Sequence, residues 1–204
     1  MSAREEILRR VRTALADVDG RQVVVPRDYR VPAPTDGLVD RFVDRVQDYR
    51  ATVTRCHPAS VDGALAEALS GCGRVLVPSG FPVPLARGVE DAGLSAVDLD
   101  EIDAVVTTAT LGIAETGTIV LTHGDGQGRR ALSLVPDLHV CLVRADQVVA
   151  GVGEAVALLD PRAPQTWISG PSATSDIELD RVEGVHGPRT LHVLLVEDGQ
   201  PPGG

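Results

Sequence analysis

Short apolar runs rich in Val, Ile and Leu alternate with amphipathic runs along most of this chain, and this alternation limits the possible folds more than any other feature. From Val53 onward, the apolar runs predict strands at residues 74–77, 104–107, 118–122, 131–135, 139–144, 166–169 and 191–196. Helical spacing predicts helices at residues 61–69, 84–92, 146–159 and 175–181. Strands alternating with helices predict an α/β fold whose sheet is at least partly parallel and has helices on both faces.

The core of such a fold has to be aliphatic in this chain. Phe, Trp and Tyr make up 2% of the 204 residues, so Val, Leu, Ile and Ala must fill the interior, as they do in buried parallel sheets. A chain of this length buries enough surface to fold without a disulfide or a metal staple. We expect residues 53–204 to form one α/β domain around this core.

The first 52 residues predict a helical extension. Ser2 and Glu5 have the spacing of a capping box, and the apolar residues after them recur at helical intervals. The prolines between Gly20 and Thr35 rule out one continuous helix, and residues 36–50 predict a second amphipathic helix. We expect residues 1–52 to form amino-terminal helices joined by a Pro-containing connection.

The charge pattern excludes several classes of function. The net charge is −10 and the basic residues are scattered, so we expect no nucleic-acid partner. All 19 basic residues are Arg, and a chain without Lys has no Schiff-base lysine and no Walker-A lysine. We find neither an apolar stretch of ~18 residues nor an apolar amino-terminal signal segment. We therefore expect no membrane span and a cytoplasmic location.

The three cysteines predict a chain without a cofactor of its own. Cys56, Cys72 and Cys141 are too far apart for a CxxC pair or a ferredoxin-like ligand run. The Gly-rich run 124–128 follows a predicted strand without opening an amphipathic helix, so it fails the context test for dinucleotide binding. We interpret that run as a hairpin tip. The purified protein should be colourless.

A segment dense in hydroxyls, residues 166–178, is the first candidate for an anion site. It combines a predicted strand, a Gly-Pro turn at Gly170 and a helix start that contains Ser172, Thr174 and Asp176. Free N–H groups at a helix start bind carboxylate or phosphate. The alternative is that every hydroxyl only caps the helix, with Asp176 as a capping and orienting residue.

Two further motifs carry candidate chemistry. Glu115, followed by Thr116 and Gly117, precedes an apolar strand, where a carboxylate would serve as nucleophile or base; the alternative is an exposed loop residue. His186 and Gly187 belong to a second Gly-Pro turn.

The basic and imidazole groups near the second turn suggest carboxylate binding. His186 with Arg189, or with Arg130 from another run, would bind and polarise a carboxylate. His139 and His192 lie inside predicted strands and are interpreted as structural. A metal triad of His186, Asp176 and Glu178 matches none of the usual ligand spacings, so we predict no metal.

Four segments together resemble a known family. They are AETGTIVL (residues 114–121), RALSLVPDLH (130–139), GPSATSDIE (170–178) and GVHGP (184–188). In this order they closely resemble the LUD domain of the lactate-utilisation protein C family. The resemblance runs from about Val53 to Val196, and the amino-terminal helices are also similar to those of the family.

The resemblance implies a fold and a function. It implies an α/β fold similar to that of the CoA-transferase and ribose-phosphate isomerase group. It also implies a subunit, without its own redox cofactor, of a complex that oxidises L-lactate to pyruvate with iron–sulphur partner proteins. The alternatives are a free-standing CoA-transferase-like or isomerase-like enzyme and an anion-binding regulator. Ala173 stands where related families carry Arg or Ala, so any anion-binding charge must come from Arg130 or Arg189.

These motifs predict one shared cleft. We expect Glu115, Arg130, Ser172, Asp176 and His186 to converge, because strand edges and Gly-bearing turns gather where α/β sheets bind ligands. The alternative is that each of these residues holds a separate loop together.

Overall fold

The structure is a computed structural model that describes residues 2–17, 25, 35–86, 88–174, 182–183 and 186–198. Two compact units, Met1–Val31 and Pro32–Gly204, make up the chain. The first contains α1 (Ala3–Ala14), whose predicted capping box is confirmed: Ser2 Oγ accepts from the Glu5 N–H, and Glu5 accepts from the Ser2 N–H at 2.7 Å. No residue of α1 is buried.

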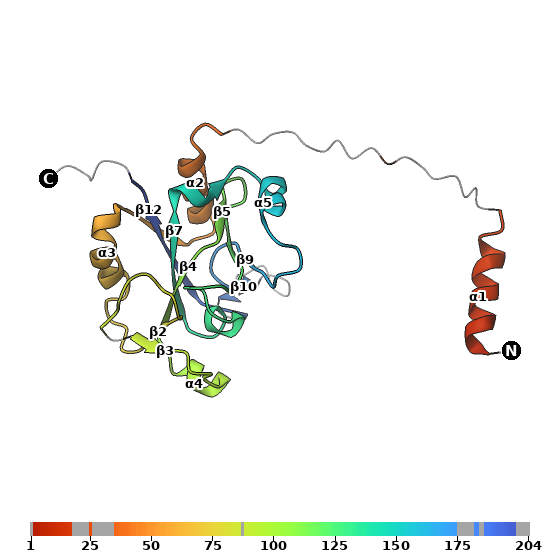
Figure 1. Cartoon of the computed structure of the whole chain (residues 1–204), viewed down its shortest axis with the longest axis horizontal. Helices are drawn as coiled ribbons and strands as arrows, with labels where there is room; N and C mark the ends of the chain where they lie inside the picture. The colour runs from red at the N-terminus through yellow and green to blue at the C-terminus, as the bar shows by residue number, and fades with distance from the viewer. Residues whose placement is uncertain are drawn as a thin grey trace. The chain divides into compact units, whose positions relative to one another are not determined.

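A six-stranded parallel sheet organises the second unit (Figure 1). Its order is β1 (Thr52–Cys56), β12 (Thr190–Val196), β7 (Leu138–Arg144), β4 (Ala104–Thr108), β2 (Val75–Val77) and β3 (Gly88–Glu90). Every neighbouring pair is parallel. The predicted α/β class, with a parallel sheet flanked by helices, is confirmed. The aliphatic residues of β4, β7 and β12 form its buried centre.

A second, four-stranded sheet is mixed. Its order is β8 (Val148–Val149), β5 (Leu111–Ile113), β6 (Thr118–Leu121) and β9 (Thr166–Ile168). β5 pairs with β6 and β6 with β9 in antiparallel fashion, whereas β5 and β8 are parallel. A short antiparallel pair, β10 (Ala173–Thr174) and β11 (Val182–Glu183), follows.

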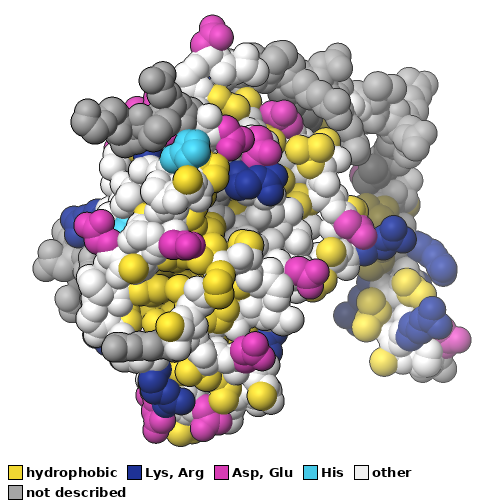
Figure 2. All heavy atoms as spheres, turned by 60° about the vertical axis from the view of Figure 1, so that its left-hand side comes forward, with side chains coloured by type: hydrophobic (Ala, Val, Ile, Leu, Met, Phe, Trp, Pro, Cys, Tyr) yellow, Lys and Arg dark blue, Asp and Glu magenta, His cyan; other side chains and the backbone are white. Residues whose placement is uncertain are grey.

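The two faces of the main sheet have different covers. On one face, α2 (Leu38–Asp48) and the second sheet pack over β7 and β12, and Phe42 and Val46 of α2 are fully buried there. On the other face, α3 (Val61–Ala68), preceded by η1 (Pro58–Ser60), packs against β4, β7 and β12. Figure 2 turns the side that carries α3 toward the viewer, and hydrophobic side chains gather there between charged ones.

Shorter helices complete the fold. Leu99 of α4 (Ala96–Asp100) and Leu132 of η2 (Arg130–Ser133) belong to one buried cluster with β2 and β4. η3 (Ala145–Gln147) leads into β8, and α5 (Val152–Leu158) packs on the second sheet through Ala155. Among the described helices, none combines the length and the apolar character needed to cross a bilayer.

Three predicted elements are wrong. Residues 131–135 are not a strand, because Arg130–Ser133 form a 3-10 turn that buries Leu132. Residues 84–92 contain β3 instead of a helix, since the free edge of β2 pairs with Gly88–Glu90. The single helix at 146–159 is divided into η3, β8 and α5, with Gly151 as the N-cap of α5. In each case the tertiary surroundings outweigh local propensity.

The Gly-rich run 124–128 is not a hairpin tip. It leads from the second sheet back to the main sheet and is fixed there by backbone bonds: the Gly126 N–H donates to Ser79 O at 2.7 Å, and the Thr108 N–H donates to Gly126 O at 2.8 Å. The predicted helix at 175–181 lies outside the described residues.

The helix α2 belongs to the same compact unit as the two sheets, and the predicted division at residue 52 stays a prediction. The second compact unit begins at Pro32 and includes α2. Val43 and Val46 of α2 share a core cluster with Cys141 and Val193 of the main sheet. The amphipathic face that predicted this helix therefore covers the α/β unit itself.

Candidate functional site

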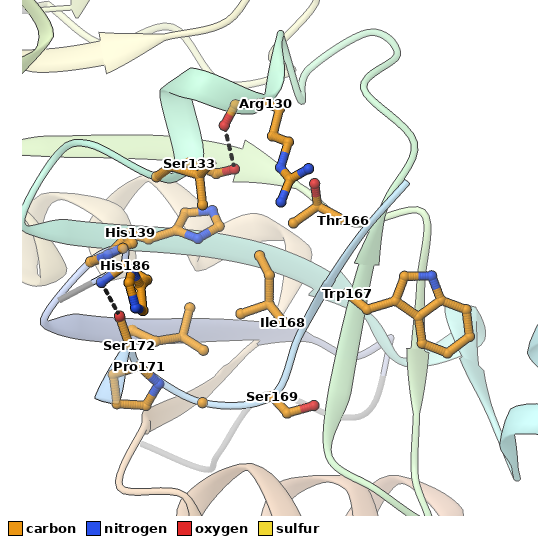
Figure 3. A pocket seen from close by; sticks show the side chains of 15 residues that line it. Arg130, Ser133, His139, Thr166, Trp167, Ile168, Ser169, Pro171, Ser172 and His186 are labelled. Carbon is orange, nitrogen blue, oxygen red and sulfur yellow. Dashed lines mark hydrogen bonds between the residues drawn. The ribbon is translucent and has the colours of Figure 1, made fainter. Parts of the chain in front are cut away.

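A pocket of about 320 Å³ lies at the amino-terminal ends of β7 and β12 (Figure 3). Its walls come from the first residues of these strands, from β9, from η2 and from the two loops that precede β10 and β12. Ligands of open α/β sheets usually bind at the carboxyl ends of the strands. The position is different here because η2 and the loops around Gly170 and Gly187 gather at the opposite edge.

Two Gly-Pro loops, one carrying Ser172 and the other His186, are joined by hydrogen bonds at this site. Ser172 Oγ accepts from the His186 N–H at 3.0 Å, and the Ser172 N–H donates to Pro188 O at 2.9 Å. A Cβ on Gly187 would lie 3.4 Å from Ser172 Cβ, so the loops are already in close contact. Because the Ser172 hydroxyl accepts from the backbone, its own proton is available to a ligand.

Arg130 provides the positive charge of the pocket. Its side chain is exposed and points from η2 into the pocket (Figure 3). In the described part of the chain, its guanidinium forms neither a hydrogen bond nor an ion pair. The neighbouring Arg129 differs, since it donates to Asp91 at 2.7 Å and holds the pKa of that carboxyl below its usual value.

The other lining groups are neutral or apolar. No Asp or Glu is found among the described residues of the wall. Ser133, Thr166 and Ser169 contribute hydroxyls that already have partners, and Leu134, Ile168 and Leu191 contribute apolar surface. Ile168 faces the pocket while Trp167 points away from it, as expected for neighbours on a strand (Figure 3). This arrangement suits a small anion with an apolar part.

His139 rises from β7 into the pocket (Figure 3). Its side chain is only 1% exposed, and its Nε2 lies 2.7 Å from Thr107 Oγ1. Burial lowers the pKa of His139 to about 4, so the imidazole is neutral at physiological pH. Burial also raises the pKa of the neighbouring Cys141 thiol to about 12.

Arg130, Gly170, Ser172, His186 and Gly187 all line this pocket. The structure thus brings together three of the five residues for which we predicted a shared cleft. Of the other two, Asp176 lies outside the described residues, whereas Glu115 is described and lies elsewhere. The segment that carries Thr174 forms β10, directly after the Ser172 loop.

Glu115, Thr116 and Gly117 form the turn between β5 and β6 and do not line the pocket. The Glu115 side chain is exposed. The turn is nevertheless connected to the pocket through hydroxyls, since Thr116 Oγ1 lies 2.7 Å from Thr118 Oγ1, which lies 2.8 Å from Ser169 Oγ.

Two of the predicted site glycines allow close packing against α2. At Gly117 (φ +60°), an added Cβ would lie 2.6 Å from the carbonyl carbon of Arg45. At Gly170 (φ +80°), it would lie 2.5 Å from Tyr49 Cβ. Both conformations favour glycine. At Gly117 the close neighbour is thus the backbone of α2.

Other candidate groups lie away from the pocket. Arg189 is 3.5 Å from Asp137 in an exposed ion pair. His192 faces Thr54, with Nε2 and Oγ1 2.9 Å apart. All three cysteines are free, and within the described ranges no group of three or more His, Cys, Asp or Glu side chains is placed to hold a metal ion.

Comparison with known proteins gives the family. The model of the LUD domain matches residues 96–196. The "Lactate utilization protein C" of Deinococcus radiodurans is 47% identical over 95% of this chain and 95% of its own length. The chain belongs to the lactate utilization protein C family. The protein of the same name from Halalkalibacterium halodurans is 34% identical over 48% of this chain and 46% of its own length.

A solved structure supports the family fold. The crystal structure of a DUF162 family protein from Deinococcus radiodurans has a TM-score of 0.68 and 39% sequence identity, and the match covers 81% of this chain and 99% of that one. The matched LUD region, residues 96–196, contains every residue of the pocket.

The sequence pattern does not identify His139 as a pocket residue. Its position inside an apolar strand favoured a structural role, and strand alternation does not show which buried side chain reaches a cavity. Ser133, which lies in a run predicted as a strand, was missed for the same reason. The pocket depends on how η2 and β9 lie against β7, which no local signal reports.

Proposed function

We propose that this chain is a subunit of a complex that oxidises L-lactate to pyruvate together with iron–sulphur partner proteins, and that its pocket binds the carboxylate of a small anion. The names of the relatives support a role in lactate utilisation. The observation that carries the site assignment is Arg130, a cation without a partner in the described part of the chain, in a pocket whose described wall contains no carboxylate.

The chemistry of the wall supports a carboxylate ligand. Arginine presents planar paired donors that match the two oxygens of a carboxylate. Ser172 has a hydroxyl proton to add, and His186 lies beside it. The chain as a whole has a net charge of −10, so the positive charge of the pocket is a local feature. A volume of about 320 Å³ suits a small molecule.

In this proposal the partner proteins carry the electrons and this chain binds the small carboxylate. Cys56 and Cys141 lie on strands β1 and β7 and Cys72 follows α3, so the three thiols belong to separate parts of the unit. We propose further that the fold belongs to the CoA-transferase and ribose-phosphate isomerase group. The alternative of acyl transfer through Glu115 has less support, because that carboxylate does not line the pocket.

Reconstitution of the complex tests the proposal. Lactate-dependent reduction of an electron acceptor should be lost when the complex contains Arg130→Gln or His186→Ala, while the subunit remains folded by circular dichroism. Arg144→Gln is the matched control, because Arg144 is an exposed arginine at the other end of β7 and pairs with Asp146. Full activity of both pocket variants would contradict the proposal, as would equal loss in the control.

A further inference from the structure

His139 has one ring nitrogen without a hydrogen-bond partner. Nε2 is engaged by Thr107 Oγ1 at 2.7 Å, while Nδ1 has no partner within the described part of the chain. The ring is 1% exposed and belongs to the pocket wall. A buried polar atom left unsatisfied is costly, and proteins generally pair such atoms. A ligand in the pocket would supply the missing partner.

Thr107 determines which kind of partner is missing. Its hydroxyl lies 3.5 Å from Cys141 Sγ and is placed to donate its single proton there. In this arrangement Oγ1 accepts from the Nε2–H of His139; the opposite arrangement, with Thr107 donating to Nε2 and the Cys141 thiol donating to Oγ1, would put the ring proton on Nδ1, and the nitrogen spectra described below distinguish the two. A neutral imidazole protonated at Nε2 has a lone pair on Nδ1, so the free position of His139 is an acceptor and needs a donor from the ligand.

A bound ligand can supply this donor beside its anionic group. Arg130 and His139 come from consecutive elements, η2 and β7, and both belong to the same pocket wall. Arg130 suits the carboxylate, and a hydroxyl on the adjacent carbon would provide a proton for Nδ1. A keto oxygen at the same position has no proton, so it would meet the lone pair of Nδ1 unfavourably.

We infer that His139 is a specificity-determining residue of the pocket, which accepts a hydrogen bond from the hydroxyl of a 2-hydroxy acid and thereby favours it over the corresponding 2-oxo acid. The inference rests on the proposed function, because it assumes that the carboxylate occupies the pocket beside Arg130. It goes further in assigning a binding role to a residue that the sequence pattern presents as structural. It also gives the pocket a preference for the reduced form of its ligand.

Binding measurements on the purified full chain test this inference. Calorimetry should compare L-lactate, pyruvate and propionate, which share a carboxylate and differ at the second carbon. L-Lactate should bind about tenfold more tightly than the other two, because one additional hydrogen bond separates them. In ¹⁵N-histidine spectra, Nδ1 of His139 should have the shift of an unprotonated nitrogen and should move on addition of lactate but not of propionate.

Two substitutions of His139 give a matched pair. Gln places its amide near the position of Nε2 and keeps a partner for Thr107, but it has no atom at Nδ1. Asn places its amide near the position of Nδ1. His139→Gln should therefore bind the three acids with equal affinity, whereas His139→Asn should retain part of the preference for lactate. The spectra of the unsubstituted chain remain decisive if either variant fails to fold.

The outcomes separate this inference from the proposed function. If none of the three acids binds, or if binding does not depend on Arg130, the proposed function of the pocket fails. If all three bind through Arg130 but pyruvate equals lactate, the role of His139 is refuted while the carboxylate site stands. An unchanged preference in His139→Gln, or an Nδ1 signal that ignores lactate, would refute it as well.

Discussion

Lowering the pH from 7 to 4 should destabilise the α/β unit mainly through His139. Burial lowers the pKa of this imidazole from 6.5 to about 4. The unfolded chain therefore binds a proton at His139 below pH 6.5 that the folded chain does not bind until pH 4. Stability from this group is complete above pH 6.5 and is lost as the pH falls toward 4. At ~1.36 kcal/mol per pKa unit, the loss is about 3 kcal/mol.

Urea unfolding at pH 7, 6, 5 and 4 measures this loss. The free energy of unfolding should fall by about 3 kcal/mol more in the unsubstituted chain than in His139→Gln, which has no group to titrate. His192→Gln is the control. Burial also lowers the pKa of His192, but this ring is only partly buried, so this substitution should change the pH slope less than His139→Gln does. The same pH slope in the His139→Gln variant and in the unsubstituted chain would refute the assignment of this titration to His139.

Three further predictions concern packing and the hydrogen bond to Thr107. Leu76→Ala should lower the free energy of unfolding by ~2–5 kcal/mol, because Leu76 is fully buried on β2; an unchanged urea midpoint would contradict its place in the core. Gly117→Ala should destabilise the chain by more than ~1 kcal/mol, since its Cβ would meet Arg45. Gly63→Ala, which meets nothing within 4 Å in α3, should be neutral or stabilising; equal melting temperatures for the two variants would refute this. Thr107→Val should reduce the preference of the pocket for lactate over pyruvate in calorimetry, and an unchanged ratio would exclude Thr107 as the group that fixes the His139 tautomer.

Long periodic segments were predictable because their local pattern matches their final environment. The amphipathic spacing of residues 36–50 predicted α2, and the apolar run at 191–196 predicted β12. Short segments were less predictable. Residues 131–135 have the composition of a strand, but they occupy a connection between two sheets, where one turn of helix buries Leu132. Packing against α4 and β4 decides that conformation, and no local signal contains it.

The residues of the candidate site also divide into those that the sequence predicted and those that it did not. Arg130, Ser172 and His186 attracted attention in the sequence because polar residues beside glycines and prolines mark turns, and turns carry binding groups. Glu115 had a similar signal but belongs to a turn outside the pocket wall. The difference between them lies in strand order, because β9 and β12 bring the Ser172 and His186 loops together while the turn after β5 does not reach that wall.

The sequence by itself determined the α/β class, the aliphatic core, the capping box of α1 and the family. These properties follow from residue type and spacing. The capping box depends on a few neighbouring residues, and the fold class and the aliphatic core depend on the composition and pattern of the whole chain. Only the tertiary structure decided that Gly117 and Gly170 make room for α2, that Arg130 has no ion-pair partner among the described residues, and that His139 reaches the pocket. These depend on contacts between residues far apart in the chain, because burial and the pairing of polar atoms are set by the elements that pack around them.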